Sequence, residues 1–351
     1  MYKKRLSSLF LVLTLIASLA LISLLSCKKK EAALPEDWPK EITFAANNHG
    51  STTYVLAVKL CDIITRYTGV TATASPTGGT GESLQLLISG DADMAFLSSY
   101  AVYDAYRGLG KQKDTGKVPL WQIMRSHTNV MCYMVRKDSD IKTPADFRGK
   151  RFAYHLSPSP LSIGVGQDLL ECNGMTTKDV NVQKIARLSD GDTALKEGTT
   201  DIAIRWIGAT GATPGVQELA ETVGIRLISL TEKDVECMRK KRGFYVSATI
   251  EPGRYKGQDE PLHLIGHSYL FTISRKLPDS LVYEMTKAIF EHIDEFYEVH
   301  AAAKEIKLTN AVTAIGAAGI SPGAVKYYKE KGVWGDKEET QQKAVLAEIG
   351  M

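Results

Sequence analysis

The sequence predicts an α/β protein built from two similar lobes. Strand-like and helix-like stretches alternate along the chain, and one pattern occurs twice. The segment Leu87–Ala95 has the form Leu-x-x-Gly-x-x-Asp-x-Ala, and Leu195–Ala203 repeats it 108 residues later. An offset of this size is too long for a solenoid repeat and suits two lobes of like topology.

The repeated pattern has a mechanical meaning. The leucine packs a helix on the sheet, the glycine ends that helix in a left-handed conformation, and the aspartate opens the turn into a short strand. At the same offset Ala45 corresponds to Ala153, each inside the first strand of its half. Ser51 likewise corresponds to Ser159, each in the loop before a helix.

Each half is expected to run strand, helix, strand, helix, strand, which predicts a mainly parallel sheet. In the first half the strands are expected at Glu41–Ala46, Val70–Ser75 and Asp93–Leu97, and the helices at Thr52–Thr68 and Glu82–Ser89. In the second half the strands are expected at Arg151–Tyr154, Asn181–Ile185 and Asp201–Arg205, and the helices at Leu161–Asn173 and Asp192–Lys196.

Two apolar stretches at either end of the second half, Met131–Arg136 and His263–Ser274, are expected to cross between the lobes. The first lobe is then discontinuous: lobe I comprises residues 40–133 and 266–351, and lobe II residues 134–265. Ser280–His300 has one apolar face and predicts a long helix, and Gly323–Lys331 predicts another after Pro322. In such folds the carboxyl ends of the strands line a crevice between the lobes, with the crossings as hinge.

The N-terminus has the layout of a secretory signal. A basic start is followed by the uncharged run Leu9–Leu25 and then by Ser26 and Cys27. We predict a signal peptide over residues 1–26, lipidation of Cys27, and a polar tether over residues 27–39. The alternative is a free cysteine beside an N-terminal membrane helix. The lipidated chain would be exported and anchored to the cell membrane, facing the periplasm or the cell exterior.

Charge and cysteine content exclude several classes of protein. The first 26 of the 351 residues hold three of the 43 Lys and Arg and none of the 40 Asp and Glu, so the remainder is formally neutral. Neutrality argues against nucleic acid as a partner. The cysteines after Cys27 are widely spaced and form no Cys-x-x-Cys pair, which argues against a zinc knuckle or a thioredoxin-like motif.

The sequence contains no recognisable catalytic motif. Gly-x-Ser-x-Gly, His-Glu-x-x-His, the phosphate loop and the EF-hand loop are all absent. His263 and His267 are expected to be structural, and the acidic residues within Glu291–Glu298 to form a solvated face. We therefore predict a protein that is not an enzyme and that needs neither cofactor nor metal.

Uncharged polar loops at the expected strand ends are the candidate ligand contacts. The loop 47–54 holds amides, hydroxyls and the first N–H groups of a helix, although one cap would explain one of its hydroxyls. Arg205 could clamp a carboxylate or form a structural ion pair, and Trp206 could stack on a ligand or simply pack. The predicted ligand-binding residues are Asn47, Asn48, His49, Ser51, Thr52, Tyr54, Thr77, Gly78, Gly79, Ser98, Ser99, Ser159, Ser162, Arg205, Trp206 and Gly208.

Seven segments, in order along the chain, resemble the TAXI family, the substrate-binding subunits of TRAP (tripartite ATP-independent periplasmic) transporters. The resemblance extends from about Ile42 to Trp334. The segments are Thr77–Leu84, Leu87–Ala95, Val135–Lys150, Val216–Leu219, Gly253–Asp259, Ala301–Lys304 and Pro322–Tyr328.

The resemblance implies a two-lobed periplasmic-binding-protein fold, similar to type II, with a cleft that closes on its ligand. It implies an extracytoplasmic receptor, acting as a monomer, that binds a small organic anion, a carboxylate or amino-acid-like solute. It further implies an ion-coupled TRAP permease as the membrane partner. The alternatives are an ABC-importer receptor for a sulfonate or heterocycle, a secreted enzyme on the same scaffold, and a surface lipoprotein without ligand.

Overall fold

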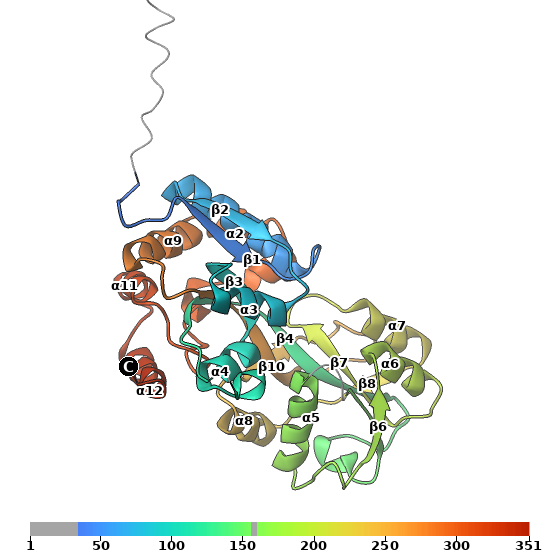
Figure 1. Ribbon diagram of the computed structural model, residues 1–351. Helices are drawn as coiled ribbons and strands as arrows, with labels where there is room; N and C mark the ends of the chain where they lie inside the picture. Colours follow the sequence, from blue (N-terminus) through green and yellow to red (C-terminus); the bar gives the residue numbers. More distant parts are fainter. Residues whose placement is uncertain (1–33, 115, 156–159, 351) are drawn as a thin grey trace, which may run out of the picture. The chain divides into compact units, whose positions relative to one another are not determined.

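One curled sheet passes through both halves of the molecule (Figure 1). The structure is a computed structural model that describes residues 34–114, 116–155 and 160–350. Within those residues the sheet has ten strands, in the order β2-β1-β3-β10-β4-β7-β5-β6, with β8 paired to β4 and β9 to β10. The predicted α/β class is confirmed, and the part of the chain that folds as one unit begins at Trp38.

The two ends of the sheet are built alike. Lobe I contains β1 (Glu41–Ala45), α2 (Thr52–Thr68), β2 (Thr71–Ser75), α3 (Thr80–Ser89), β3 (Met94–Ser98) and α4 (Ser99–Arg107). Lobe II contains β5 (Arg151–His155), α5 (Pro160–Cys172), β6 (Asn181–Ile185), α6 (Leu188–Lys196), β7 (Ile202–Gly208) and α7 (Pro214–Thr222). The expected elements are present with ends shifted by a few residues.

The predicted repeat is reproduced in the hydrogen bonds of the sheet. In lobe I the carboxylate of Asp93 accepts a bond from Thr43 N at 2.9 Å, and Asp93 N donates to Thr43 O. In lobe II, 108 residues later, Asp201 makes the same two bonds with Arg151. The aspartate of the pattern therefore does more than open a turn, because it also fixes its strand beside the first strand of the lobe.

Two long antiparallel strands join the lobes, β4 (Trp121–Arg136) and β10 (Leu262–Ile273). The first part of β4 pairs with β10, and its last part pairs with β7 and with β8 (Ile225–Leu227). The expected crossing at Met131–Arg136 was too short, because β4 already begins at Trp121. This pairing agrees with the predicted lobe boundaries, which stay a prediction.

The two crossing strands pack closely against each other at Gly266. A Cβ atom placed there would lie 2.0 Å from Asn129 O, so the strands leave no room for a side chain. Gly266 is therefore required where the two lobes meet.

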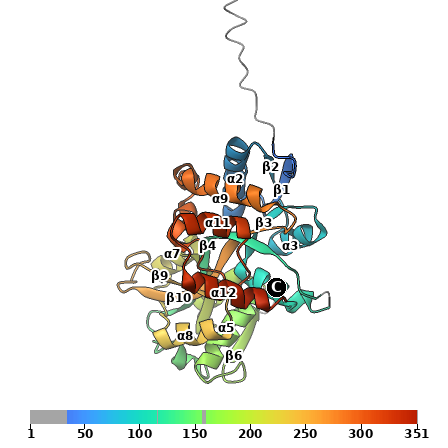
Figure 2. The ribbon, with the colours of Figure 1, turned by 90° about the vertical axis from the view of Figure 1, so that its left-hand side faces the viewer.

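The C-terminal segment covers lobe I with α9 (Asp279–Glu291), α11 (Pro322–Glu330) and α12 (Asp336–Ala347), which Figure 2 shows, and with the short helix α10 (Ile293–Tyr297). The expected single helix Ser280–His300 is wrong, since the chain breaks at His292. The His292 ring stacks on Tyr67 of α2 at 3.5 Å, and Glu295 bonds with Lys59 and Arg66 of the same helix. These contacts turn α10 toward α2.

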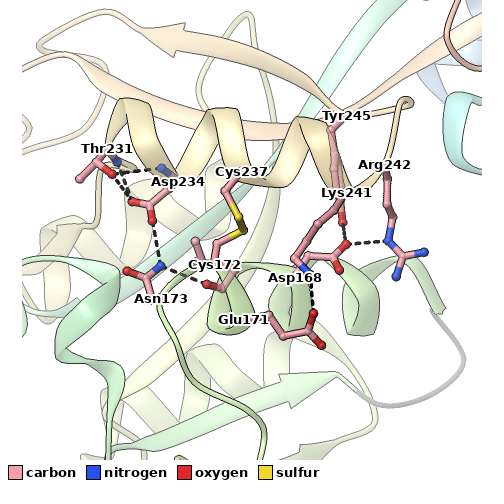
Figure 3. The surroundings of a disulfide bond; sticks show 11 residues. Asp168, Glu171, Cys172, Asn173, Thr231, Asp234, Cys237, Lys241, Arg242 and Tyr245 are labelled. Atoms are coloured by element: carbon pink, nitrogen blue, oxygen red, sulfur yellow. Dashed lines mark hydrogen bonds and ion pairs between the residues drawn. A yellow bond between two sulfur atoms is a disulfide. The ribbon is translucent and has the colours of Figure 1, made fainter.

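Lobe II also carries α8 (Glu232–Lys241), which the sequence pattern did not predict, and β9 (Val246–Ile250) follows it. A disulfide between Cys172 and Cys237 joins α5 to α8 (Figure 3). Cys61 and Cys132 are buried and free. Among the described residues, no helix is both long and apolar enough to span a membrane.

Candidate ligand-binding site

Three helices begin at one cavity between the lobes. The cavity has a volume of about 510 Å³ and is lined by first-turn residues of α3, α4 and α5: Thr80, Gly81, Tyr100, Ala101 and Leu161. Each of these helices follows a strand of the sheet, so their N-termini gather at the carboxyl edge. The positive ends of three helix dipoles make this edge favourable for an anion.

Aromatic rings form one wall of the cavity. Trp206 from β7 lies edge-on to His267 from β10 at 5.1 Å, and His267 lies edge-on to Tyr269 at 5.3 Å. Tyr269 also stacks at 4.8 Å on His127 of β4, which is not one of the residues that line the cavity. Ser162 of α5 accepts a hydrogen bond from Trp206 Nε1 at 2.9 Å, which fixes the indole ring across the two elements.

His267 of this wall and its neighbour His127 are neutral at physiological pH. Burial lowers the pKa of His267 to about 4 and that of His127 to about 3. Burial also raises the pKa of Tyr269, against a hydrogen bond with Thr80. The wall therefore offers polar ring atoms without formal charge.

The charged side chains that line the cavity are Asp104 and Lys111, and Gln85 and Asn129 add amide groups. Asp104 is only 8% exposed. Burial raises its pKa, although a hydrogen bond from Tyr100 and the charges of Arg242 and Arg107 act in the opposite direction. A second cavity of about 390 Å³ adjoins the first and shares Tyr100, Asp104 and Leu161 with it.

A larger hollow of about 690 Å³ lies on α8 and β9. We do not assign the ligand to it, because the described residues that line it include a single helix start, that of α8, and that start is already capped. Thr231 and Asp234 cap each other there in a capping box, and Glu232 adds a second carboxylate to the first turn. The positive end of this helix thus faces the protein's own acidic groups.

The predicted residues Ser98 and Trp206 line the 510 Å³ cavity. Ser98 also caps α4 by accepting from Ala101 N. Ser162 accepts the hydrogen bond from Trp206 Nε1 and so holds the indole ring in place. Ser99 is buried, donates to Phe244 O and accepts from Ser268 N, so it ties α4 to the crossing region.

The predicted loop 47–54 lies outside the residues that line the cavity. Asn47 is buried with φ 64°, donates from Nδ2 to Phe96 O, and accepts from Ser83 Oγ at 3.4 Å. Its amide therefore braces the sheet against α3. Ser51 caps α2.

Other members of that loop make contacts around the start of α2. The His49 ring packs on Tyr54 at 4.7 Å, and the Thr52 hydroxyl lies 3.5 Å from His300 Nε2. The Asn48 side chain lies close to Gly79: a Cβ atom placed on Gly79 would be 3.4 Å from Asn48 Oδ1.

The glycine loop before α3 is adjacent to the cavity without lining it. Thr77 shares a hydrogen bond with Ser83 at 2.8 Å, and Gly78 N donates to the Glu82 carboxylate. Gly79 has φ 127°, a conformation that glycine adopts readily. The loop thus sets the direction in which α3 starts.

Arg205 and Trp206 point to opposite faces of β7, as neighbours on a strand must. Trp206 faces the cavity, while Arg205 forms an ion pair with Asp192 of α6 at 2.5 Å. Of the two interpretations left open for Arg205, the structure favours the structural one. Gly208 pairs with Asn129 on β4. Cys27 and Ser159 lie outside the described residues.

Sequence reasoning missed Asp104, Lys111, Asn129, His267 and Tyr269 as cavity residues. One available signal was the i, i+4 spacing of Tyr100 and Asp104, which shares a helix face once a helix is assigned after Ser98. Another was the i, i+2 spacing of His267 and Tyr269 on an expected strand. Within the described residues, no group of three or more His, Cys, Asp or Glu could hold a metal ion.

Comparison with known proteins agrees with this fold. Residues 44–332 match the family described as NMT1-like. The chain belongs to the NMT1-like family. The solved TctC solute-binding protein from Polaromonas is 12% identical, with a TM-score of 0.50, and the match covers 84% of this chain and 98% of that one. Its similarity supports the two-lobed fold.

Two further solved structures are similar at lower scores. The periplasmic aliphatic sulphonate binding protein SsuA from Escherichia coli is 14% identical over 88% of this chain and 85% of that one, with a TM-score of 0.46. The L-cystine solute receptor of Neisseria gonorrhoeae is 12% identical over 76% and 92%, with a TM-score of 0.41. The predicted TAXI membership stays a proposal.

Proposed function

We propose that this NMT1-like protein is an extracytoplasmic solute receptor. In this proposal it binds a small organic anion between its lobes and delivers it to a membrane permease. The observation that carries the proposal is the meeting of the starts of α3, α4 and α5 at one cavity. Three helix dipoles that point at one cavity favour a negative group there. Lys111 lines the same cavity and adds a positive charge.

The work of such a receptor is closure of the cleft and needs no covalent step. Lobe I contributes α3 and α4 to the cavity, and lobe II contributes α5 and Trp206. A ligand that contacts both sides would favour the closed arrangement, since it stabilises the state in which it makes more contacts. The crossing strands β4 and β10 are the segments about which the lobes would move.

Two experiments test the receptor function directly. Native mass spectrometry of protein purified without added solute should show an excess mass that is lost on unfolding. Calorimetric titration should then show binding of the recovered solute. A protein that retains no solute and binds no small carboxylate in titration would contradict the proposal.

Lys111 allows a matched test of the anion. Lys111→Met should weaken binding of the recovered solute about three- to tenfold and reduce its salt dependence, as expected for a charge at the rim of a site. Lys113→Met removes the same charge from an exposed residue two positions away that does not line the cavity, and should leave affinity unchanged. Equal effects of both variants would argue against an anion at this cavity.

The anchor and the permease form the finer part of the proposal. We propose that Cys27 is lipidated and that the permease is an ion-coupled TRAP protein, on the strength of the signal-like N-terminus and the TAXI resemblance. Cys27→Ser should release the protein into the soluble exported fraction. Uptake by vesicles that contain the permease should stop with an ionophore and continue without ATP. An ATP requirement would favour the ABC-importer alternative.

A further inference from the structure

Asp104 carries a negative charge into the cavity that the helix N-termini make favourable for an anion. It lies one turn after Tyr100 on α4, so both side chains share the face that lines the cavity. Asp104 lines the adjoining cavity as well. At 8% exposure it is almost fully removed from water.

The charge of Asp104 has no ion-pair partner among the described residues. Arg242, which lines the adjoining cavity, is held by Asp168 at 2.6 Å, and Asp168 also accepts from Tyr245 (Figure 3). Arg107 is held by Glu348 at 2.7 Å. Arg242 and Arg107, the two cations that lower the pKa of Asp104, are therefore each ion-paired with another carboxylate. Burial outweighs them, so the pKa of Asp104 is raised.

A buried carboxylate without a counter-ion is unfavourable in the empty protein. A positively charged group brought by the ligand would compensate it. The surroundings suit such a group, since Tyr100 donates a hydrogen bond to the carboxylate and the Trp206 ring lines the same cavity. Aromatic faces attract cations in addition to the carboxylate.

We infer that Asp104 binds a protonated nitrogen of the ligand, while the starts of α3, α4 and α5 bind its anionic end. The solute is then a zwitterion, and Asp104 is the residue that selects for its nitrogen. This inference rests on the proposed function and narrows its ligand from organic anions in general to those that also carry an ammonium or guanidinium group.

The test compares acids that differ only in the amine. The probes are L-glutamate against glutarate, L-leucine against 4-methylpentanoate, and 4-aminobutyrate against butyrate, each titrated by calorimetry into solute-free protein. At least one amine-bearing probe should bind, and its amine-free partner should bind about 30-fold more weakly or worse. Equal affinity within every pair that binds would overturn the inference and leave the proposed function standing. If all six probes fail, the retained solute decides: a solute without a basic nitrogen would overturn the inference alone, and the absence of any retained solute would overturn both.

Variants then assign the selectivity to Asp104. Asp104→Asn keeps the size of the side chain and should abolish the difference within the pair, by weakening the amine-bearing probe alone. Asp114→Asn makes the same charge change at an exposed residue outside the cavity and should leave the difference intact. If Asp104→Asn instead weakens both members of the pair equally, Asp104 does not select for the nitrogen, and the inference is wrong. The comparison of probes on the unmodified protein still decides if the variant does not fold.

Discussion

The two lobes share one scaffold and differ in the segment after its last strand. In both lobes the first and last parallel strands are joined in the same register, Ala45 beside Ala95 and Ala153 beside Ala203. In lobe I, β3 ends at Ser98 and α4 starts at once. In lobe II, β7 continues to Gly208 and its next helix begins only at Pro214.

This difference decides what each lobe offers to a ligand. Lobe I presents the start of α4 with Tyr100 and Asp104, whereas lobe II presents the side chain of Trp206 from a strand. The repeated strands and helices thus form the scaffold of both lobes. The candidate ligand contacts Tyr100, Asp104 and Trp206 lie in the segments that follow the repeated pattern, where the two lobes differ. The lobes also differ in their cross-links, since the described disulfide joins α5 and α8 of lobe II.

The junction between the lobes gives the largest expected effect. Gly266→Ala should lower the free energy of unfolding by about 3 kcal/mol or more, because its Cβ would lie 2.0 Å from Asn129 O and 2.6 Å from Val130 Cα. Chemical denaturation measures the loss. Gly164→Ala, in α5, is the control and should be neutral or slightly stabilising, since its nearest neighbour would be 3.9 Å away. Similar stability of both variants would show that the crossing tolerates side chains.

The disulfide should stabilise lobe II alone. It closes a sequence separation of 65 residues, for which loop-closure entropy predicts a contribution of about 4 kcal/mol, with about 2–4 kcal/mol usual in practice. Replacing Cys172 and Cys237 together by Ser should lower unfolding stability by that amount. A reductant should destabilise the unmodified protein and have no further effect on the double variant. Equal hydrogen-exchange protection of α5 and α8 in both proteins would contradict this assignment.

Arg205 and Trp206 are neighbours on β7, but we expect Arg205 to stabilise the fold and Trp206 to bind the ligand. Arg205→Met should lower unfolding stability by about 2 kcal/mol, because it leaves Asp192 largely buried without its partner, and burial already raises the pKa of that carboxyl. Its ligand affinity should not change. Trp206→Leu should weaken binding of the recovered solute about tenfold or more, as loss of an aromatic anchor does. Calorimetry and thermal unfolding on both variants test this; weaker binding by Arg205→Met would restore Arg205 as a ligand clamp.

The smallest expected effect on stability comes from replacing Asp93 and Asp201, which occupy the same position of the repeated pattern in the two lobes. Arg151 lowers the pKa of Asp201 from 3.8 by hydrogen bonding, and the ion pair between them measures 2.6 Å. The pair is partly exposed, so Asp201→Asn should cost about 0.5–1 kcal/mol more than Asp93→Asn, whose strand partner is Thr43.

The pH dependence of this difference comes from the lowered pKa of Asp201. A lowered folded-state pKa stabilises the protein fully above the unfolded value and no longer does so once pH falls through the folded value. The extra stability that Asp201 provides should therefore shrink as the pH falls below about 4. Denaturation at several pH values measures it, and a constant difference down to pH 2 would contradict the role of the ion pair.

Local patterns in the sequence were enough to predict the frame. The Leu-x-x-Gly-x-x-Asp-x-Ala segment predicts its own helix end and strand start, because Gly90 and Gly198 need positive φ angles of 85° and 72° to end a helix. Both appear as predicted. The break at His292 could not be predicted, since it depends on stacking with Tyr67, more than 200 residues away in sequence.

The candidate site was less accessible to such reasoning. Its aromatic wall forms only when β4 pairs with both β10 and β7, which brings His267 and Tyr269 of β10 beside Trp206 of β7. β4 and β10 are more than 100 residues apart in sequence, and no short sequence pattern indicates which distant strands will pair. The polar loop 47–54 is predicted to contact the ligand because it holds more amides and hydroxyls than one helix cap needs. In the structure two of its side chains, Asn47 and Ser51, bond with backbone groups of lobe I, which no pattern within the loop could show.

The central claim is that the two lobes close on a small solute between them. Small-angle X-ray scattering tests it most directly, on the solute-free protein and on the same protein saturated with the recovered solute. We expect a smaller radius of gyration with solute, because α3 and α4 would approach α5 and Trp206. An unchanged radius of gyration at saturating solute would contradict the claim.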